Sequence, residues 1–272
     1  MGVRRRRRAP SSFQSLAIRR SPRNSDSVVD KKVIAKISGG PSPHRSRIGR
    51  EVAARLEANP GVRRARTDAA QMYTYPDFLT DAECDALVAL IDANSRPSTL
   101  LAKSEDPEYR TSDSSDLNRW DDTVGPIDLR IAGLLGIPAE NAETLQGQRY
   151  AVNQQFRAHC DYFHESSAYW PKMQETGGQR TWTAMAYLND VTEGGATWFP
   201  RAGLRFKPKK RLLVIWNNML PDGSPNYDTL HEGMRVIEGT KYIVTKWFRE
   251  EAWLRQPIDT YVSPGVETAT DE

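Results

Sequence analysis

Near its middle the chain reads Phe156-Arg157-Ala158-His159-Cys160-Asp161-Tyr162-Phe163, an aromatic run of residue types that favour a β-strand. Side chains alternate between the two faces of a strand, so we expect His159 and Asp161 to project together and Cys160 to project oppositely. An imidazole and a carboxylate on one face need one more ligand to hold a transition metal. His231 is the best candidate, because it precedes a second apolar, strand-like segment. We therefore predict a metal site formed by His159, Asp161 and His231.

Lys241 adds a second chemical feature to this pattern. In the segment from Gly239 to Trp247, the side chains of Lys241, Ile243 and Thr245 share one strand face. A lysine directed into a protein interior is costly unless it pairs with an anion, and a dicarboxylic co-substrate would supply one. Two histidines with one carboxylate leave coordination positions open, and this ligand set is typical of non-heme Fe(II) oxygenases.

Further motifs follow one another in order between about Met72 and Arg249. They are Gln148-Arg149-Tyr150, Asn153-Gln154-Gln155-Phe156, Arg180 through Val191, Glu193-Gly194-Gly195-Ala196-Thr197-Trp198-Phe199-Pro200, Lys207-Pro208-Lys209-Lys210, Trp216-Asn217-Asn218 and His231-Glu232-Gly233. In these motifs the chain resembles the prolyl 4-hydroxylase branch of the 2-oxoglutarate/Fe(II) dioxygenases. The resemblance implies an α+β, mainly β fold: a double-stranded β-helix, or jelly-roll barrel, with supporting N-terminal helices.

The resemblance also implies roles for individual residues. His159, Asp161 and His231 would ligate Fe(II), and Lys241 would complete the catalytic set by pairing with the distal carboxylate of 2-oxoglutarate. Further co-substrate contacts would come from Tyr150, Thr183 and Trp247. Substrate contacts would come from Arg180, Arg110, Tyr169 and Trp170. The implied cofactors are Fe(II) and 2-oxoglutarate, with ascorbate as reductant and O₂ as the second co-substrate.

Two positions depart from the family's motifs. Asn153 stands where a glycine is usual, and Arg211 follows Lys210 where another glycine is usual. Asn tolerates left-handed backbone angles, so we expect the turn at Asn153 to be retained. Neither change touches the predicted metal site.

Charge is divided unevenly along the chain. Residues 1–68 hold 18 Lys and Arg against 5 Asp and Glu, whereas the remainder holds 20 against 30. The first 45 residues are rich in Arg, Ser and Pro and contain few apolar residues, so burial cannot offset the entropy of ordering them. We predict a disordered basic tail at 1–45, a helix and linker at 46–70, a dioxygenase domain at 71–255 and a flexible C-terminal tail at 256–272.

Two or three helices are expected ahead of the main sheet. Ile48, Val52 and Leu56 recur at helical spacing, Thr80 to Glu83 forms a capping box, and a helix containing Ile127 and Ile131 should end at Gly136. The polar segment 109–117 has the composition of a mobile lid or of an ordinary exposed loop.

The predicted activity is hydroxylation of a prolyl residue in a peptide or protein. One alternative is a free amino-acid hydroxylase with the same chemistry. Another is a non-catalytic barrel whose basic arm, residues 1–45, contacts nucleic acid. A nucleic-acid demethylase is disfavoured, because the acidic remainder of the chain would repel phosphate.

Composition also bears on the compartment. No apolar run reaches the ~18 residues that a membrane span requires. Cys84 and Cys160 are the two cysteines; we expect both to be small buried residues in a reducing environment. We therefore expect a cytoplasmic protein without membrane contact, and the sequence does not indicate its oligomeric state.

Overall fold

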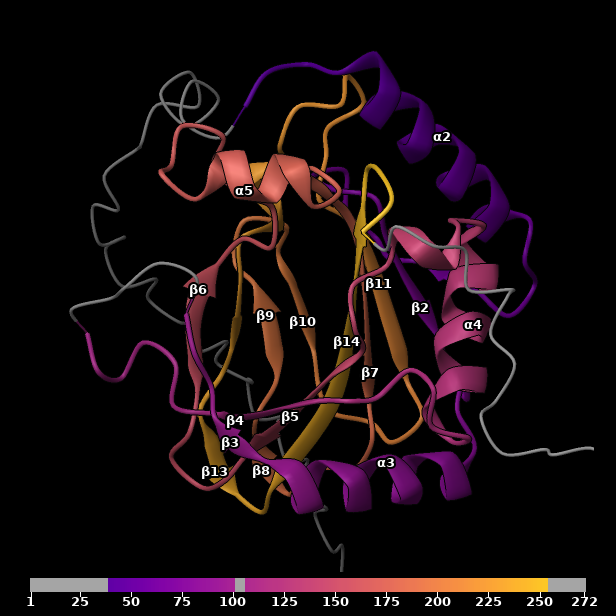
Figure 1. Cartoon of the computed structure of the whole chain (residues 1–272). Helices are drawn as coiled ribbons and strands as arrows, with labels where there is room; N and C mark the ends of the chain where they lie inside the picture. The colour runs from indigo at the N-terminus through magenta and orange to yellow at the C-terminus, as the bar shows by residue number, and fades with distance from the viewer. Residues whose placement is uncertain (1–38, 101–105, 254–272) are drawn as a thin grey trace, which may run out of the picture. The chain divides into compact units, whose positions relative to one another are not determined.

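The fold comes from a computed structural model that describes residues 39–100 and 106–253. Two antiparallel sheets face each other, helices α2, α3 and α4 pack on the outer side of the larger sheet, and α5 lies across one end of the strands (Figure 1). The helices are α2 (Pro43–Glu57), α3 (Asp81–Asn94), α4 (Val124–Leu135) and α5 (Trp170–Glu175), with 3-10 turns η1 (Ala139–Asn141) and η2 (Tyr227–Thr229). Most of the predicted N-terminal tail and all of the predicted C-terminal tail lie outside the described residues.

The larger sheet contains eight strands. In spatial order they are β1 (Arg63–Arg64), β2 (Met72–Tyr75), β11 (Leu213–Asn217), β7 (Arg180–Tyr187), β14 (Lys241–Arg249), β5 (Gln146–Tyr150), β4 (Asp113–Asp116) and β3 (Arg96–Pro97). The smaller sheet is β10 (Leu204–Phe206), β9 (Thr197–Phe199), β12 (His231–Gly233) and β6 (Phe156–His159), and β13 (Val236–Glu238) pairs with β8 (Glu193–Gly194). Two facing antiparallel sheets are the arrangement of a jelly roll. Among the described residues no strand joins the edges of the two sheets, so the predicted barrel is not closed.

Two hydrophobic clusters hold the layers together. Between the sheets, Tyr187, Phe199 and Trp216 are buried at the centre of one cluster. A larger cluster, including Leu56 of α2 and Ile131 of α4, fills the space between the larger sheet and its helices. The sheets therefore enclose a cavity on one side, while the helices support the larger sheet from the other.

The N-terminal helix begins earlier than we predicted. α2 starts at Pro43, with the Ser42 side chain accepting a hydrogen bond from the Arg45 amide. Serine at the N-cap followed by proline at the first helical position is a signal for the start of a helix. Our prediction gave more weight to the low apolar content of residues 1–45 and therefore placed the helix start too late. Arg45 is buried and its Nη1 lies 2.6 Å from Oε1 of Glu165, so the predicted tail boundary at residue 45 is wrong. The predicted linker also contains β1.

The other two predicted helices are confirmed. Both hydrogen bonds of the Thr80–Glu83 capping box are present at the start of α3. α4 ends at Gly136, which adopts the left-handed conformation with φ of 71°. Cys84 is fully buried on α3, as expected, whereas Cys160 is only partly buried.

Part of the segment from 109 to 117 is a strand, which we did not predict. Residues 113–116 form β4, which pairs with β5 inside the larger sheet. The side chains of Ser112 and Ser114 are buried and both hydrogen-bond to the Ser98 hydroxyl. Composition was misleading here, because serine is more common in turns and loops than in strands.

Two non-glycine residues occupy the positions where the family motifs carry glycine, and both have positive φ. Asn153 has φ of 70° and Arg211 has φ of 76°. The turn at Asn153 is therefore retained, as predicted. At Arg211 the side chain holds the loop, since Nε donates to the Leu79 carbonyl and the guanidinium lies 3.2 Å from Asp77.

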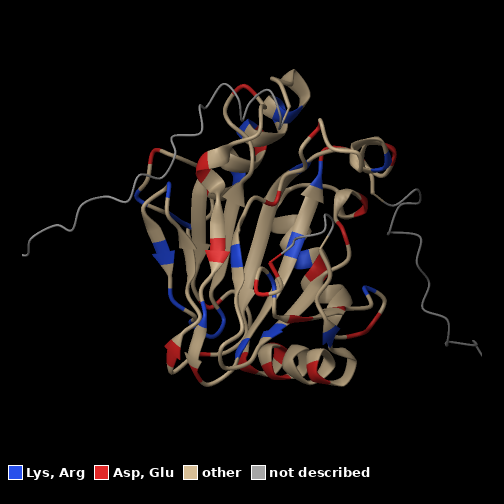
Figure 2. Cartoon of the chain, turned by 90° about the vertical axis from the view of Figure 1, so that its left-hand side faces the viewer, with Lys and Arg blue, Asp and Glu red and all other residues tan. Residues whose placement is uncertain are grey.

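The outer face of the smaller sheet carries charges of both signs. Figure 2 shows basic and acidic segments interspersed over this side of the molecule. Across neighbouring strands, Arg205 and Glu232 flank Trp198. Within the described part of the chain, no helix has the length and apolarity needed to cross a bilayer.

Candidate metal and co-substrate site

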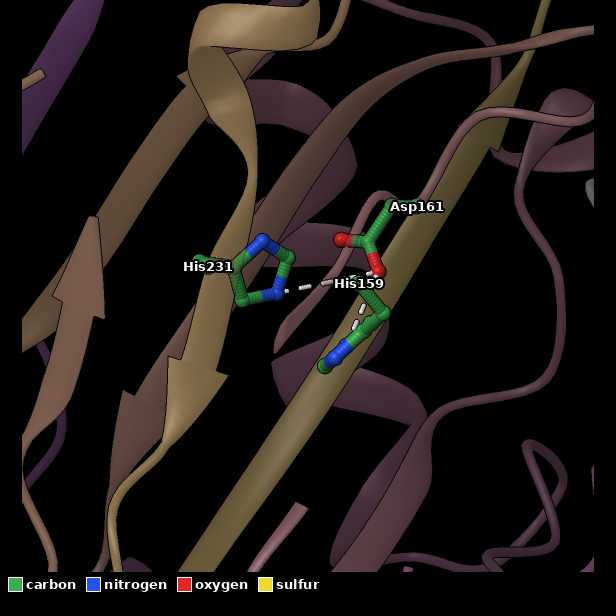
Figure 3. Close-up of side chains that lie close together, drawn as sticks. All are labelled: His159, Asp161 and His231. Atoms are coloured by element: carbon green, nitrogen blue, oxygen red, sulfur yellow. Dashed lines mark ion pairs between the residues drawn. The ribbon is translucent and has the colours of Figure 1, made fainter. Parts of the chain in front are cut away.

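The three predicted metal ligands lie together between the two sheets. His159 ends β6, His231 begins β12, and the two residues are paired across these strands. The Nε2 atoms of His159 and His231 lie 3.8 Å and 3.9 Å from Oδ1 of Asp161, and Figure 3 shows the three side chains directed toward one another. Asp161 lies beyond the end of β6, so alternation along a continuous strand was not the reason that it faces the same way as His159.

Each histidine is oriented by the backbone two residues before it. Nδ1 of His159 donates to the Arg157 carbonyl at 2.8 Å, and Nδ1 of His231 donates to the Thr229 carbonyl at 2.9 Å. Because a carbonyl oxygen can only accept, the ring proton must sit on Nδ1, and the Nε2 lone pair is directed into the cluster. Burial lowers the pKa of His159 to about 3, with a further contribution from His231. The neutral imidazole required of a metal ligand is thus the stable form.

The carboxylate of Asp161 has two distinct oxygens. Oδ1 faces both histidines, whereas Oδ2 accepts a hydrogen bond of 2.8 Å from the Thr183 hydroxyl. Burial alone would raise the pKa of Asp161, but the two histidines, the Arg180 guanidinium and the Thr183 hydroxyl together lower it. The cluster therefore offers two neutral nitrogens and one anionic oxygen, a donor set that suits Fe(II).

Lys241 lines the same cavity from β14. Its side chain is 1% exposed and, among the described residues, has no acidic partner or hydrogen bond. Nζ lies over the rings of Tyr150 at 4.8 Å and Tyr187 at 5.6 Å. Burial lowers the pKa of Lys241 to about 7. Burying an ammonium group is costly unless an anion pairs with it. A carboxylate of a dicarboxylic acid in the cavity would provide that anion.

The cavity contains some predicted residues and some that the sequence did not suggest. Tyr150 and Trp247 line it, as do Ile243 and Thr245 on the predicted face of β14. Further lining residues are Gln148, Phe156, Met185, Thr197, Trp216 and Gly233. Gln148 could have been found from alternation on β5, because it lies two residues before Tyr150 and accepts a hydrogen bond from the Tyr150 hydroxyl.

Thr183 lies elsewhere than predicted. Its side chain is fully buried behind Asp161, to which it donates, and it does not line the cavity. This geometry does not support the expected contact between Thr183 and the co-substrate. Thr197 of β9 lies on the cavity wall instead, with its hydroxyl 2.7 Å from that of Tyr187. The Gly194-Gly195 turn ahead of Thr197 is the sequence signal that could have identified it.

Arg180 is held in place by acidic and aromatic neighbours. Its Nε and Nη2 donate to the two carboxylate oxygens of Glu143 at 2.6 Å and 2.7 Å. The guanidinium group lies 4.2 Å from the ring centre of Trp247 and 4.8 Å from that of Phe163. Arg180 is thus adjacent to the cavity through Trp247.

The remaining predicted substrate residues do not line the cavity. The Arg110 guanidinium lies 4.6 Å from the ring centre of Phe156, which in turn stacks on His159. Tyr169 and Trp170 stand at the start of α5, where the Tyr169 hydroxyl accepts a hydrogen bond from the His164 amide. The structure therefore brings Arg110 close to the ligand cluster through one ring and leaves Tyr169 and Trp170 farther out.

This fold and this cluster define a jelly-roll protein with a two-histidine, one-carboxylate site. Residues 145–249 match the profile of the 2OG-Fe(II) oxygenase superfamily. The chain is 37% identical over 200 residues to the probable prolyl 4-hydroxylase 8 of Arabidopsis thaliana, covering 65% of this chain and 67% of that protein. It is 33% identical over 193 residues to the prolyl 4-hydroxylase subunit alpha-1 of Rattus norvegicus, covering 67% of this chain and 35% of that subunit.

Solved structures agree with this assignment. The 2OG complex of the viral collagen prolyl hydroxylase from Paramecium Bursaria Chlorella virus-1 is similar with a TM-score of 0.53 and 27% identity, covering 68% of this chain and 99% of that one. A prolyl hydroxylase from Trichoplax adhaerens shares the fold at 14% identity, with a TM-score of 0.51 and coverage of 82% and 94%. The chain belongs to the prolyl 4-hydroxylase family of 2-oxoglutarate- and Fe(II)-dependent oxygenases, with Fe(II) and 2-oxoglutarate as its cofactors. The jelly-roll prediction is confirmed.

Proposed function

We propose that this protein hydroxylates prolyl residues of a peptide or protein, with His159, Asp161 and His231 holding Fe(II) and Lys241 holding 2-oxoglutarate. The observation that carries the proposal is Lys241, a buried ammonium group that shares a cavity with the three ligands and lacks an anion. The curated relatives, which are prolyl 4-hydroxylases, support the choice of proline as the target. Ascorbate is proposed as the reductant that keeps the iron ferrous.

Bound Fe(II) together with 2-oxoglutarate supplies an O₂-dependent oxidation that can place a hydroxyl group on an unactivated C–H bond. The protein contributes orientation and exclusion of water. His159 and His231, each fixed by a hydrogen bond to a backbone carbonyl, would hold Fe(II) together with Asp161. Lys241 fixes the far carboxylate of the co-substrate, and the rings of Tyr150 and Tyr187 shield that ion pair from water.

We place the substrate on the side of the cavity where Trp247 and Arg180 meet. The Trp247 indole nitrogen is buried and, within the described residues, has no hydrogen-bond partner. Two of the three Arg180 nitrogens are occupied by Glu143, so Nη1 remains available to a peptide carbonyl. Arg110, Tyr169 and Trp170 are proposed to contact the peptide farther from the reacting carbon.

Turnover of 2-oxoglutarate to succinate tests the proposal. The purified protein is supplied with Fe(II), ascorbate and O₂, together with a proline-rich peptide, free L-proline or no additive. Peptide-stimulated turnover with hydroxyproline in the peptide is expected, and it should disappear in His231→Ala. His164→Ala is the matched control, because His164 lies outside the cavity. Stimulation by free proline alone would replace the peptide by an amino acid as substrate. Absence of turnover in every arm would overturn the proposal.

A nucleic-acid substrate finds no support in the described residues. Basic and acidic residues are interspersed along the strands on this side of the molecule (Figure 2), whereas phosphate binding favours a concentration of Lys and Arg. Residues 1–38, the main part of the basic arm, lie outside the described residues.

A further inference from the structure

A second layer of hydrogen bonds lies behind the metal-facing side of Asp161. Nδ2 of Asn218 donates to Oγ1 of Thr183 at 2.9 Å, and the Thr183 hydroxyl donates to Oδ2 of Asp161 at 2.8 Å. Asn218 and Thr183 are fully buried, and Asp161 is 6% exposed. The two bonds form a chain that runs from the end of β11 through β7 to the carboxylate.

The direction of both hydrogen bonds is fixed by their chemistry. The contact of 2.8 Å between Oγ1 of Thr183 and a carboxylate oxygen requires the hydroxyl proton between them. Having donated its only proton, Oγ1 can only accept from Asn218, which sets the orientation of that amide. The amide oxygen of the same side chain, Oδ1, is buried and has no hydrogen-bond partner among the described residues. Asn218 thus orients the hydroxyl, and the hydroxyl in turn orients the carboxylate.

The backbone of Asn218 joins this chain to the segment that carries His231. Its amide donates to the Thr181 carbonyl, and its carbonyl accepts from the Asn226 amide, both at 2.8 Å. Asn226 caps the turn η2, and its carbonyl accepts the Thr229 hydroxyl at 2.7 Å. The Thr229 carbonyl then accepts Nδ1 of His231. Asn218 is therefore linked by hydrogen bonds both to Asp161, through the Thr183 side chain, and to His231, through Asn226 and Thr229.

We propose that Thr183 and Asn218 are positioning residues for the metal site. The Thr183 hydroxyl, held in turn by Asn218, occupies Oδ2 of Asp161, which would leave Oδ1 to bind the ion. This inference rests on the proposed function, since it assumes that Asp161 is a metal ligand. Residues that orient metal ligands in this way typically affect metal affinity about 10- to 100-fold.

Titration of the full-length protein with Co(II), which replaces Fe(II) without turnover, gives a readout independent of activity. Thr183→Val keeps the side-chain shape and removes the hydroxyl, and its Kd for Co(II) should rise about 10-fold or more. Thr183→Ser should restore most of the affinity. Thr181→Val is the matched control, because it removes another buried hydroxyl of β7 that donates to the Phe248 carbonyl instead of to a ligand. Its Kd should stay within twofold of the unsubstituted protein.

A double-mutant cycle separates a relay from general damage. Because Asn218 acts through the Thr183 hydroxyl, Asn218→Leu should weaken Co(II) binding in the unsubstituted background and have no further effect in Thr183→Val. Additive effects, or a Thr183→Val protein that binds Co(II) as tightly as the original, would overturn the inference. Should Thr183→Val not fold, an unchanged Kd in folded Asn218→Leu would overturn it equally. Failure of the unsubstituted protein to bind Co(II) would count against the proposed function itself.

Discussion

Replacing Lys241 with methionine should weaken 2-oxoglutarate binding without weakening the fold. The side chain is fully buried and has no acidic partner among the described residues, so the charge serves no internal ion pair. A charge-assisted hydrogen bond to a carboxylate contributes about 1.5–3 kcal/mol. That corresponds to an increase of about 10- to 150-fold in the Kd for 2-oxoglutarate. Calorimetric titration of the Mn(II)-loaded protein with 2-oxoglutarate measures the change.

Lys241 should favour 2-oxoglutarate binding but lower the stability of the ligand-free protein at neutral pH. The folded-state pKa of Lys241 is about 7, below its ordinary value of 10.5, so between these values the unfolded chain binds more protons. Stability of the ligand-free protein therefore gains a contribution from Lys241 as pH rises from about 7 toward 10.5. This contribution should be missing in Lys241→Met, which should be at least as stable as the original protein at pH 7. Denaturant unfolding at several pH values tests this.

Lys246 of the same strand provides the matched control. It is also fully buried, but it contacts the Asp128 carboxylate in the helical layer. Lys246→Met should therefore cost about 3 kcal/mol of stability, because it removes one partner of a buried ion pair, and it should leave the Kd for 2-oxoglutarate unchanged. Lys241→Met binding 2-oxoglutarate within twofold of the original protein would refute the reasoning, as would equal destabilisation by both substitutions.

Three further outcomes are expected. The Kd for 2-oxoglutarate should not change with pH below pH 7, where Lys241 is already charged. Above pH 7 the Kd should rise by up to about tenfold per pH unit, because binding must then take up a proton. Titration across pH 6–9 measures this dependence. Saturating Mn(II) at about 100 times its Kd should stabilise the protein by about 2.7 kcal/mol, and His231→Ala should abolish this gain in melting experiments. Arg45→Ala should cost about 1.5–3 kcal/mol in denaturant unfolding, because it removes a buried charged hydrogen bond to Glu165, whereas Arg47→Ala, at an exposed ion pair, should cost less than about 1 kcal/mol.

The ligand cluster could be predicted because its members are few and chemically distinctive. The chain has four histidines, and only His159 and His231 stand in strand-like segments with a carboxylate nearby. The alternation on β14 also predicted correctly that Lys241, Ile243 and Thr245 share a face. The prediction that Asp161 lies beside His159 was correct, but the reason given for it was not. β6 ends at His159, so the two side chains do not share a face of one continuous strand.

Long-range pairing set the limits of prediction. The role of Thr183 depends on its contact with Asp161 across 22 residues, and no local pattern distinguishes a threonine facing the cavity from one behind a carboxylate. The strand β4 was missed because serines normally indicate loops, whereas here the buried Ser114 hydroxyl is hydrogen-bonded to Ser98, 16 residues away, and to Arg110. The start of α2 was readable from Ser42-Pro43 and was obscured by the composition of the residues before it.

The left-handed residue Arg211 has a consequence for the conditions under which the protein is handled. A non-glycine residue in this region costs about 1–2 kcal/mol, and here the turn is secured by partly exposed charges, with Asp77 at 3.2 Å and Asp81 at 3.8 Å. Exposed ion pairs weaken as salt increases, with a screening length of about 8 Å at physiological ionic strength. A glycine would adopt this backbone conformation freely, whereas Arg211 depends on its side-chain contacts with Asp77, Asp81 and the Leu79 carbonyl. Local opening of this loop, followed by amide hydrogen exchange, should therefore accelerate with ionic strength, and Arg211→Gly should remove that salt dependence.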